Sequence, residues 1–125
     1  MSNTDSILDT IKIKIGINPD YDDAFDVHII TNINTTFERL KYLGIGPDNG
    51  FRITGSTETW DMYLTNGEFI DSVIDYISMK VKMLFAPPET SFGIEAIKEQ
   101  LSELEFFLKI KSDEIMVQNN GSNQD

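Results

Sequence analysis

Apolar residues recur at helical spacing along most of the chain. In one stretch they are four, four and three positions apart, which predicts a helix from about Ala24 to Leu43 with one buried face. That face consists of Ile29, Ile33, Phe37 and Leu40. The same spacing predicts helices at about 5–15 and 68–85, and a last helix that begins at Thr90 or Ser91.

Glycine, proline and aspartate mark the predicted helix ends. Gly44 follows the second helix, at the place where a left-handed residue commonly ends a helix. Ala86-Pro87-Pro88 ends the helix at 68–85, because proline has no amide hydrogen and crowds the preceding turn. We expect Asp22 or Asp23 to cap the second helix, since a short carboxylate accepts hydrogen bonds from free amides of a first turn.

The segment after the second helix has a different pattern. Gly46-Pro47 and Asn49-Gly50 are turn signals, and residues 51–53 alternate like a short strand for which the chain offers no evident partner. Thr57 or Thr59 is expected to cap a brief helix nearby.

This glycine-rich and aromatic segment is either packed as a cap over the helices or projects as a contact element, and the sequence leaves both open. Its candidate contact residues are Phe51, Arg52, Ile53 and Trp60.

These elements predict an all-α fold. We expect a small bundle of four to five helices with a short extended excursion around residues 50–56. The helical domain comprises residues 1–110, because the apolar pattern fades from Lys111 onward. Residues 111–125 are then expected to be a polar C-terminal tail.

The predicted helix at 68–85 is apolar on two sides. Its inward stripe is expected to contain Ile70, Ile74, Ile77, Val81 and Leu84. Met79 and Met83 lie on the opposite side, together with Tyr76. A helix with this pattern is either central in a bundle or buried at a partner surface. Met79 and Met83 are therefore candidate contacts.

Two further groups are candidates for contact with a partner. Phe106 lies two positions from both Leu104 and Leu108, about 200° round the helix, so it is expected to point away from the core. An apolar island within the polar tail is a candidate anchor that orders on a partner. It consists of Ile115, Met116 and Val117.

Charge and composition narrow the possible functions. The net charge of −11 on 125 residues opposes attraction to nucleic-acid phosphates and to anionic membranes. It fits either a well-solvated surface or the lining of a passage through which DNA slides without adhering. We expect no signal peptide and no membrane segment, since the N-terminus is polar and charges interrupt the most apolar helix.

No catalytic, cofactor-binding or metal-binding residue is predicted. Cysteine is absent, and His28 is the only histidine. A calcium loop that starts at Asp20 requires an oxygen ligand at its fifth position and glycine at its sixth, where Ala24 and Phe25 stand. The aspartates around Asp22 are therefore interpreted as helix-start residues. The sequence does not predict an enzyme.

Several small motifs together resemble the head–tail connector family of tailed bacteriophages, also called head-completion or adaptor proteins. The resemblance extends over about residues 5–110. It is carried by Leu43-Gly44-Ile45-Gly46-Pro47, Gly50-Phe51-Arg52-Ile53, Trp60, Leu84-Phe85-Ala86-Pro87-Pro88, Ser91-Phe92 and Glu103-Leu104-Glu105.

The resemblance implies a structural virion protein that forms a ring with copies of itself, expected to be dodecameric. The ring would lie under the portal protein, extend the DNA channel and offer a platform to a tail or stopper protein. DNA would pass through without specific binding, and the protein would act at the head–tail interface after assembly in the host cytoplasm. Carried onto this chain, the resemblance makes Lys111–Val117 the candidate portal anchor and Gly50–Trp60 the candidate contact loop.

Other classes of function remain open at this level. Small acidic proteins of mobile elements include DNA mimics and other host-interaction proteins. A mimic requires carboxylates at phosphate-like intervals over one continuous face, whereas here they cluster at helix starts and on outer faces. A small regulatory enzyme would require a pocket.

Overall fold

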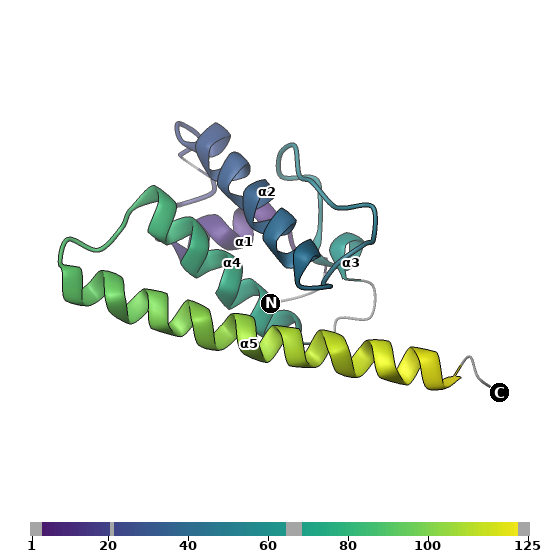
Figure 1. Cartoon of the computed structure of the whole chain (residues 1–125). Coiled ribbons are helices and arrows are strands. Elements are labelled where there is room, and N and C mark those ends of the chain that lie inside the picture. Colours follow the sequence, from purple (N-terminus) through teal and green to yellow (C-terminus); the bar gives the residue numbers. More distant parts are fainter. Residues whose placement is uncertain (1–3, 21, 65–68, 123–125) are drawn as a thin grey trace.

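The structure is a computed structural model and describes residues 4–20, 22–64 and 69–122. It contains five helices (Figure 1): α1 (Ile7–Lys14), α2 (Asp26–Tyr42), α3 (Trp60–Tyr63), α4 (Ile70–Phe85) and α5 (Ser91–Ser122). Within these ranges no strand forms, and the only β-type pairing is an isolated bridge between Ser6 and Thr59. The all-α prediction is confirmed.

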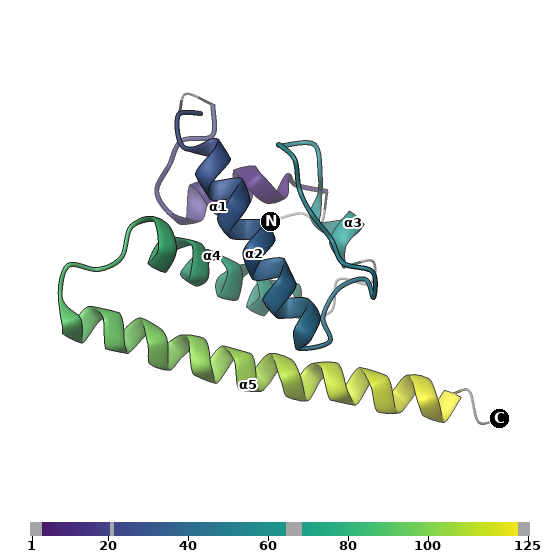
Figure 2. The same ribbon diagram turned by 45° about the horizontal axis from the view of Figure 1, so that its top comes forward.

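Helix α4 is the central helix of the bundle. It packs against α2 on one side and α5 on the other, and it also contacts α1. Figures 1 and 2 show α5 along one edge of the molecule, with α1 on the far side of α4. Helix α2 crosses α4, and its C-terminal end comes close to α5, where Arg39 pairs with Glu105. The central position of α4 explains why it is apolar on two sides. Tyr76 and Ile77 are both fully buried, although they point in different directions from the helix axis.

The predicted core stripe of α2 is confirmed. All four of its apolar residues, Ile29, Ile33, Phe37 and Leu40, are buried. Each such side chain contributes roughly 1.5–3 kcal/mol when it is fully removed from water. In α4 the stripe is only partly right, because Leu84, in the last turn of the helix, is exposed.

The predicted cap of α2 is wrong. The helix begins at Asp26 after Phe25, and no side chain caps its first turn. Lys12 explains the difference: its ammonium group is buried, lies 2.7 Å from the carboxylate of Asp26 and donates to the backbone carbonyl of Asp22 at 2.6 Å. The carboxylate of Asp22 instead accepts a hydrogen bond from the amide of Ala24.

Helix α5 is longer than predicted. The sequence pattern fades at Lys111, but the helix continues to Ser122. Ser112 supports this continuation, because its hydroxyl donates to the carbonyl of Gly44 at 3.0 Å. Pairs of opposite charge within the helix, such as Lys109 with Asp113, add to it. The C-terminal part of α5 therefore projects beyond the rest of the bundle as a helix (Figure 1).

Candidate interaction surfaces

The extended segment after α2 is held by a side chain instead of a second strand. Asn34 of α2 is buried, and its amide group makes both hydrogen bonds that a neighbouring strand would make. Its Nδ2 donates to the carbonyl of Ile53 at 3.0 Å, and its Oδ1 accepts from the amide of Ile53 at 2.8 Å. These two hydrogen bonds satisfy the buried amide and carbonyl of Ile53 without a sheet. Asn34 was not among the predicted functional residues, although its place next to the inward residue Ile33 was a usable signal.

Trp60 joins the loop to the start of the chain. Its indole nitrogen donates to the hydroxyl of Thr10 at 3.1 Å, and that hydroxyl donates to the carbonyl of Ser6 at 2.8 Å. The amide of Ile7 donates to the carbonyl of Glu58 at 3.0 Å, so α1 and the loop are also joined through their backbones.

Two of the candidate contact residues therefore lie in the core. Ile53 and Trp60 are each 1 % exposed, so neither presents a surface to a partner, and this part of the prediction is corrected. The cause is the alternation of the extended segment, which turns Ile53 inward onto α2. Arg52 is exposed and Phe51 is half-buried, so these two stay at the surface of the loop.

Aromatic rings form the base of the loop. The ring of Phe37 on α2 lies 5.4 Å from that of Phe51 and 4.5 Å from that of Tyr63. Gly46 has a φ of +92°, and a Cβ there would lie 2.6 Å from the Tyr63 ring. Glycine is thus required both by the backbone conformation and by the close approach of the ring. Burial raises the pKa of Tyr63 far above its usual range, so its hydroxyl stays neutral.

Glu58 closes the outer end of the loop. Its carboxylate accepts hydrogen bonds from the amide and the hydroxyl of Thr54, at 2.8 and 2.9 Å. Partial burial acts to raise the pKa of Glu58, but these hydrogen bonds outweigh it and the pKa is lowered overall. The carboxylate form therefore stabilises the loop.

This arrangement predicts a pH-dependent contribution to stability. Because the pKa is lower in the folded chain, the stabilisation is present above the unfolded-state pKa of about 4.3 and is lost as the pH falls through the folded value. We expect wild type to melt at a higher temperature than Glu58→Gln at pH 7, with the difference shrinking toward pH 3. Thermal denaturation by circular dichroism measures it. An equal difference at both pH values would contradict this account.

The outward face of α5 carries large apolar side chains in water. Phe106 is 70 % exposed, as predicted, and Ile110, one turn later, is also exposed. Glu99 and Glu103 lie on the same face in the two preceding turns, and both are exposed. The opposite side of the helix packs inward through residues such as Leu108, which is fully buried.

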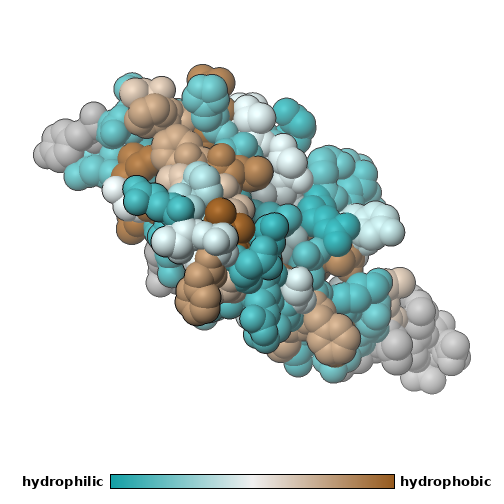
Figure 3. Space-filling model, turned by 60° about the vertical axis from the view of Figure 1, so that its left-hand side comes forward, coloured by the Kyte–Doolittle hydropathy of each residue, from teal (hydrophilic) through white to brown (hydrophobic). Residues whose placement is uncertain are grey.

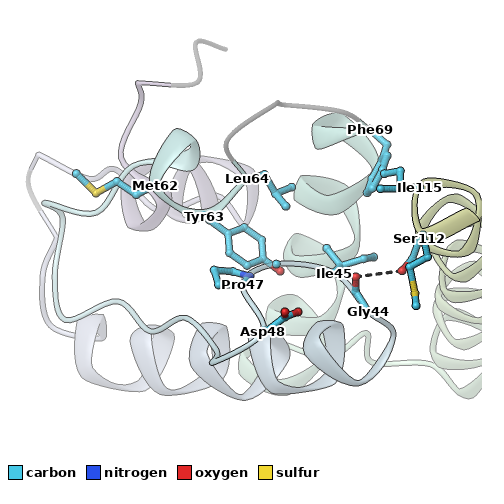
Figure 4. Close-up of a pocket in the computed structure, with 12 residues that line it drawn as sticks. Gly44, Ile45, Pro47, Asp48, Met62, Tyr63, Leu64, Phe69, Ser112 and Ile115 are labelled. Atoms are coloured by element: carbon cyan, nitrogen blue, oxygen red, sulfur yellow. Dashed lines mark hydrogen bonds between the residues drawn. The ribbon is translucent and has the colours of Figure 1, made fainter. Parts of the chain in front are cut away.

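The C-terminal half of α5 borders a groove of about 490 Å³. Figure 4 shows Ile115 beside Phe69 at one side of the groove, with Ser112 below Ile115 and bonded to the carbonyl of Gly44. Ile115 is half-buried, whereas Met116 is 56 % exposed. Val117 belongs to the helix, but its side chain lies outside the described residues. Of the two predicted anchor residues whose side chains are described, Met116 is therefore the more exposed.

A third apolar surface lies at the other end of α5, where α4 turns into it. Phe92 is 86 % exposed in the first turn of α5, and Leu84 is exposed in the last turn of α4. Phe25, directly before α2, is also exposed. The ring of Phe25 contacts that of Phe85, with centroids 5.2 Å apart. Figure 3 views this end of the molecule and shows hydrophobic side chains gathered over one part of it among hydrophilic ones.

Met79 and Met83 are both half-buried. Met79 packs against the core of the same chain, which accounts for its apolar character without a partner. The exposed residues at the α4–α5 turn, Leu84 and Phe92, were not among the predicted contacts.

Within residues 4–20, 22–64 and 69–122, no group of three or more His, Asp or Glu side chains is placed to hold a metal ion. In the same part of the chain, no helix is both long and apolar enough to cross a membrane.

Comparison with known proteins gives one family. The family model described as "Phage connector protein" matches residues 7–115, which include all five helices except the last part of α5. No curated protein and no solved structure gives a significant match. The matched region contains the buried loop, the bundle and most of the exposed face of α5. The chain therefore belongs to the phage connector protein family and has a structural, connecting role in a phage particle.

Proposed function

We propose that this protein is a head–tail connector subunit that assembles into a ring under the phage portal. The ring would extend the DNA channel and offer a platform to the tail or to a stopper protein. The family match over residues 7–115 carries this proposal. The dodecameric state that we expect follows from the earlier resemblance to head–tail connectors.

The two ends of α5 suit two different partners. The helix has 32 residues, so at 1.5 Å per residue it is about 48 Å long. Met116 is exposed toward its C-terminal end, and Phe92 is exposed in its first turn. We assign the Met116 end to the portal and the Phe92 end, with Leu84 and Phe25, to the tail-side partner.

The acidic charge suits a DNA conduit. With a net charge of −11 per subunit, a ring repels the phosphate backbone and gives DNA no surface to adhere to. Passage without binding is the behaviour that a channel lining requires.

Electron cryomicroscopy of this protein mixed with the portal protein of the same genome tests the proposal. We expect a ring of additional density on the outer end of the portal, with the C-terminal part of α5 at the junction. An intact portal without added density would overturn the proposal. Competition with DNA for a nuclease would then test the alternative of a DNA mimic.

Met116 provides a prediction for the portal contact. We expect Met116→Asp to weaken portal docking at least tenfold, because the contact would have to bury a charge without a partner. The melting temperature should change little, since the side chain is exposed in the free protein. Titration of labelled protein against immobilised portal measures the affinity.

Ser102→Asp is the matched control for this experiment. Ser102 is exposed on the same helix, so the variant adds the same charge away from the C-terminal end. It should dock like wild type. Equal docking by Met116→Asp and wild type would remove Met116 from the portal contact.

A further inference from the structure

The groove at the C-terminal end of α5 lies where the inward side of this helix passes beyond the core. Ile115 is seven positions after Leu108, so at 100° per residue the two side chains point to nearly the same side of the helix. Leu108 is fully buried, whereas Ile115 is only half-buried and Met116, next to it, is 56 % exposed. The side of α5 that packs on the core at Leu108 therefore lines the groove at Ile115.

Most of the described residues that line the groove are apolar. They come from the loop after α2, from α3 and the residues beside it, and from α5. Met62 on α3 and Met116 on α5 are the exposed apolar members, at 60 and 56 %. Methionine is flexible and polarisable, so surfaces that carry it adapt to different apolar partners. The lining therefore suits an apolar occupant.

Tyr63 places a polar group in this apolar lining. Its side chain is 3 % exposed, and its hydroxyl makes no hydrogen bond with any described residue. Figure 4 shows the ring extending from α3 toward the loop that carries Ile45 and Pro47. A buried hydroxyl without a partner is costly, and most such groups in folded proteins have one. The hydroxyl of Tyr63 therefore indicates a hydrogen-bond partner that an occupant of the groove supplies.

Charge restricts the chemistry of that occupant. Among the described lining residues Asp48 alone carries a charge, and it forms no ion pair with another described residue. The chain as a whole has a net charge of −11. An acidic segment is repelled by this surface, whereas a neutral or basic one is not. In a neutral segment, the group that can accept a hydrogen bond from a tyrosine is a backbone carbonyl.

We propose that this groove binds an apolar, uncharged or basic peptide segment of a partner protein, with a backbone carbonyl of the segment accepting a hydrogen bond from Tyr63. The volume of about 490 Å³ is within the range of sites that enclose a ligand. The hydroxyl lies 3.2 Å from the Cβ position of Gly46, at the wall of the groove, so a small movement of the ring or of this wall exposes it to the occupant. Side-chain movements of this size are common at protein interfaces.

This inference rests on the proposed connector function, under which the partner is the portal protein. It specifies the form of that contact, because the portal segment then lies between α5 and the α3 side of the groove. A contact made by the projecting end of α5 alone would leave Met62 and Tyr63 untouched. Variants on the α3 side therefore distinguish the two kinds of contact.

Tyr63→Phe tests the hydrogen bond, because its expected effects on stability and on docking have opposite signs. The variant should melt at the same temperature as wild type or higher, since it removes an unsatisfied buried hydroxyl. It should nevertheless bind the portal about three- to tenfold more weakly, since one hydrogen bond to the segment is lost. Circular dichroism gives the melting temperature, and titration of labelled protein against immobilised portal gives the affinity.

Tyr76→Phe is the matched control. It removes the same atom from another buried tyrosine, which lies on α4 and does not line the groove, so it should dock like wild type. Equal docking by Tyr63→Phe and wild type would overturn the inference. An equal loss of docking in both variants would overturn it too, because the effect would then not belong to the groove.

A cross-link identifies the occupant. The chain has no cysteine, so Met62→Cys gives a single site for a benzophenone maleimide at the exposed α3 side of the groove. After irradiation of the complex with the portal, we expect adducts with one apolar, non-acidic portal segment, identified by mass spectrometry. Adducts with other copies of this protein only, or with no portal segment, would overturn the inference. These results leave the connector function standing, whereas a wild-type protein that does not bind the portal would remove it.

Discussion

Trp60→Ala is expected to lower the free energy of unfolding by roughly 3–5 kcal/mol, because it empties a fully buried aromatic site and leaves the surrounding core without contacts. It also removes the hydrogen bond from the indole to Thr10 and so loosens α1 from the loop. For a domain of this size such a loss is a large part of the total stability. Chemical denaturation with intrinsic tyrosine fluorescence and circular dichroism measures it.

Trp60→Phe separates packing from hydrogen bonding. It keeps an aromatic ring in the site but has no indole nitrogen, so we expect a smaller loss than with alanine. A loss for Trp60→Ala of less than about 1 kcal/mol would mean that this tryptophan is not the packing centre of the loop.

Asn34→Leu is expected to destabilise the fold by roughly 2–5 kcal/mol, because it leaves both the amide and the carbonyl of buried Ile53 without partners. The extended segment should then separate from α2, since the two Asn34 hydrogen bonds hold it there in place of a second strand. Hydrogen exchange reports this directly, with much faster exchange at the Ile53 amide, and denaturant titration gives the stability.

Thr35→Leu is the control on the same helix. Thr35 is exposed, and its hydroxyl bonds only to the carbonyl of Thr31, so we expect a change within about 0.5 kcal/mol. Unchanged protection of the Ile53 amide in Asn34→Leu would show that the side chain does not hold the segment.

Periodicity predicted the bundle because burial on one face leaves a strong signal in a helix. The residues of the α2 stripe lie where the pattern placed them, and Phe106 points outward as expected. Polar residues in the interior left no such signal. Lys12 and Asn34 are both buried through specific hydrogen bonds to backbone carbonyls far along the chain, and such pairings depend on the tertiary fold.

The same limit explains the errors in the candidate contacts. Residues 51–53 alternate in the sequence, but alternation does not say which side faces the bundle. Asn34 settles this by binding Ile53, so Ile53 and Trp60 become core residues and Arg52 remains outside. Helix α5 extends past Lys111 because Ser112 bonds to Gly44, just after the end of α2. The two residues are 68 positions apart in the sequence, so no local pattern reveals this contact.

The length of α5 has a mechanical consequence for a connector. A single continuous helix spans the subunit from the α4–α5 turn to the C-terminal end, so it acts as a rigid lever between the surfaces assigned to tail and portal. With a length of about 48 Å, a tilt of about 5° at one end displaces the other by about 4 Å. That displacement is close to the pitch of one helical turn. A small change in how the portal binds the helix would therefore move the tail-side contact by almost one turn.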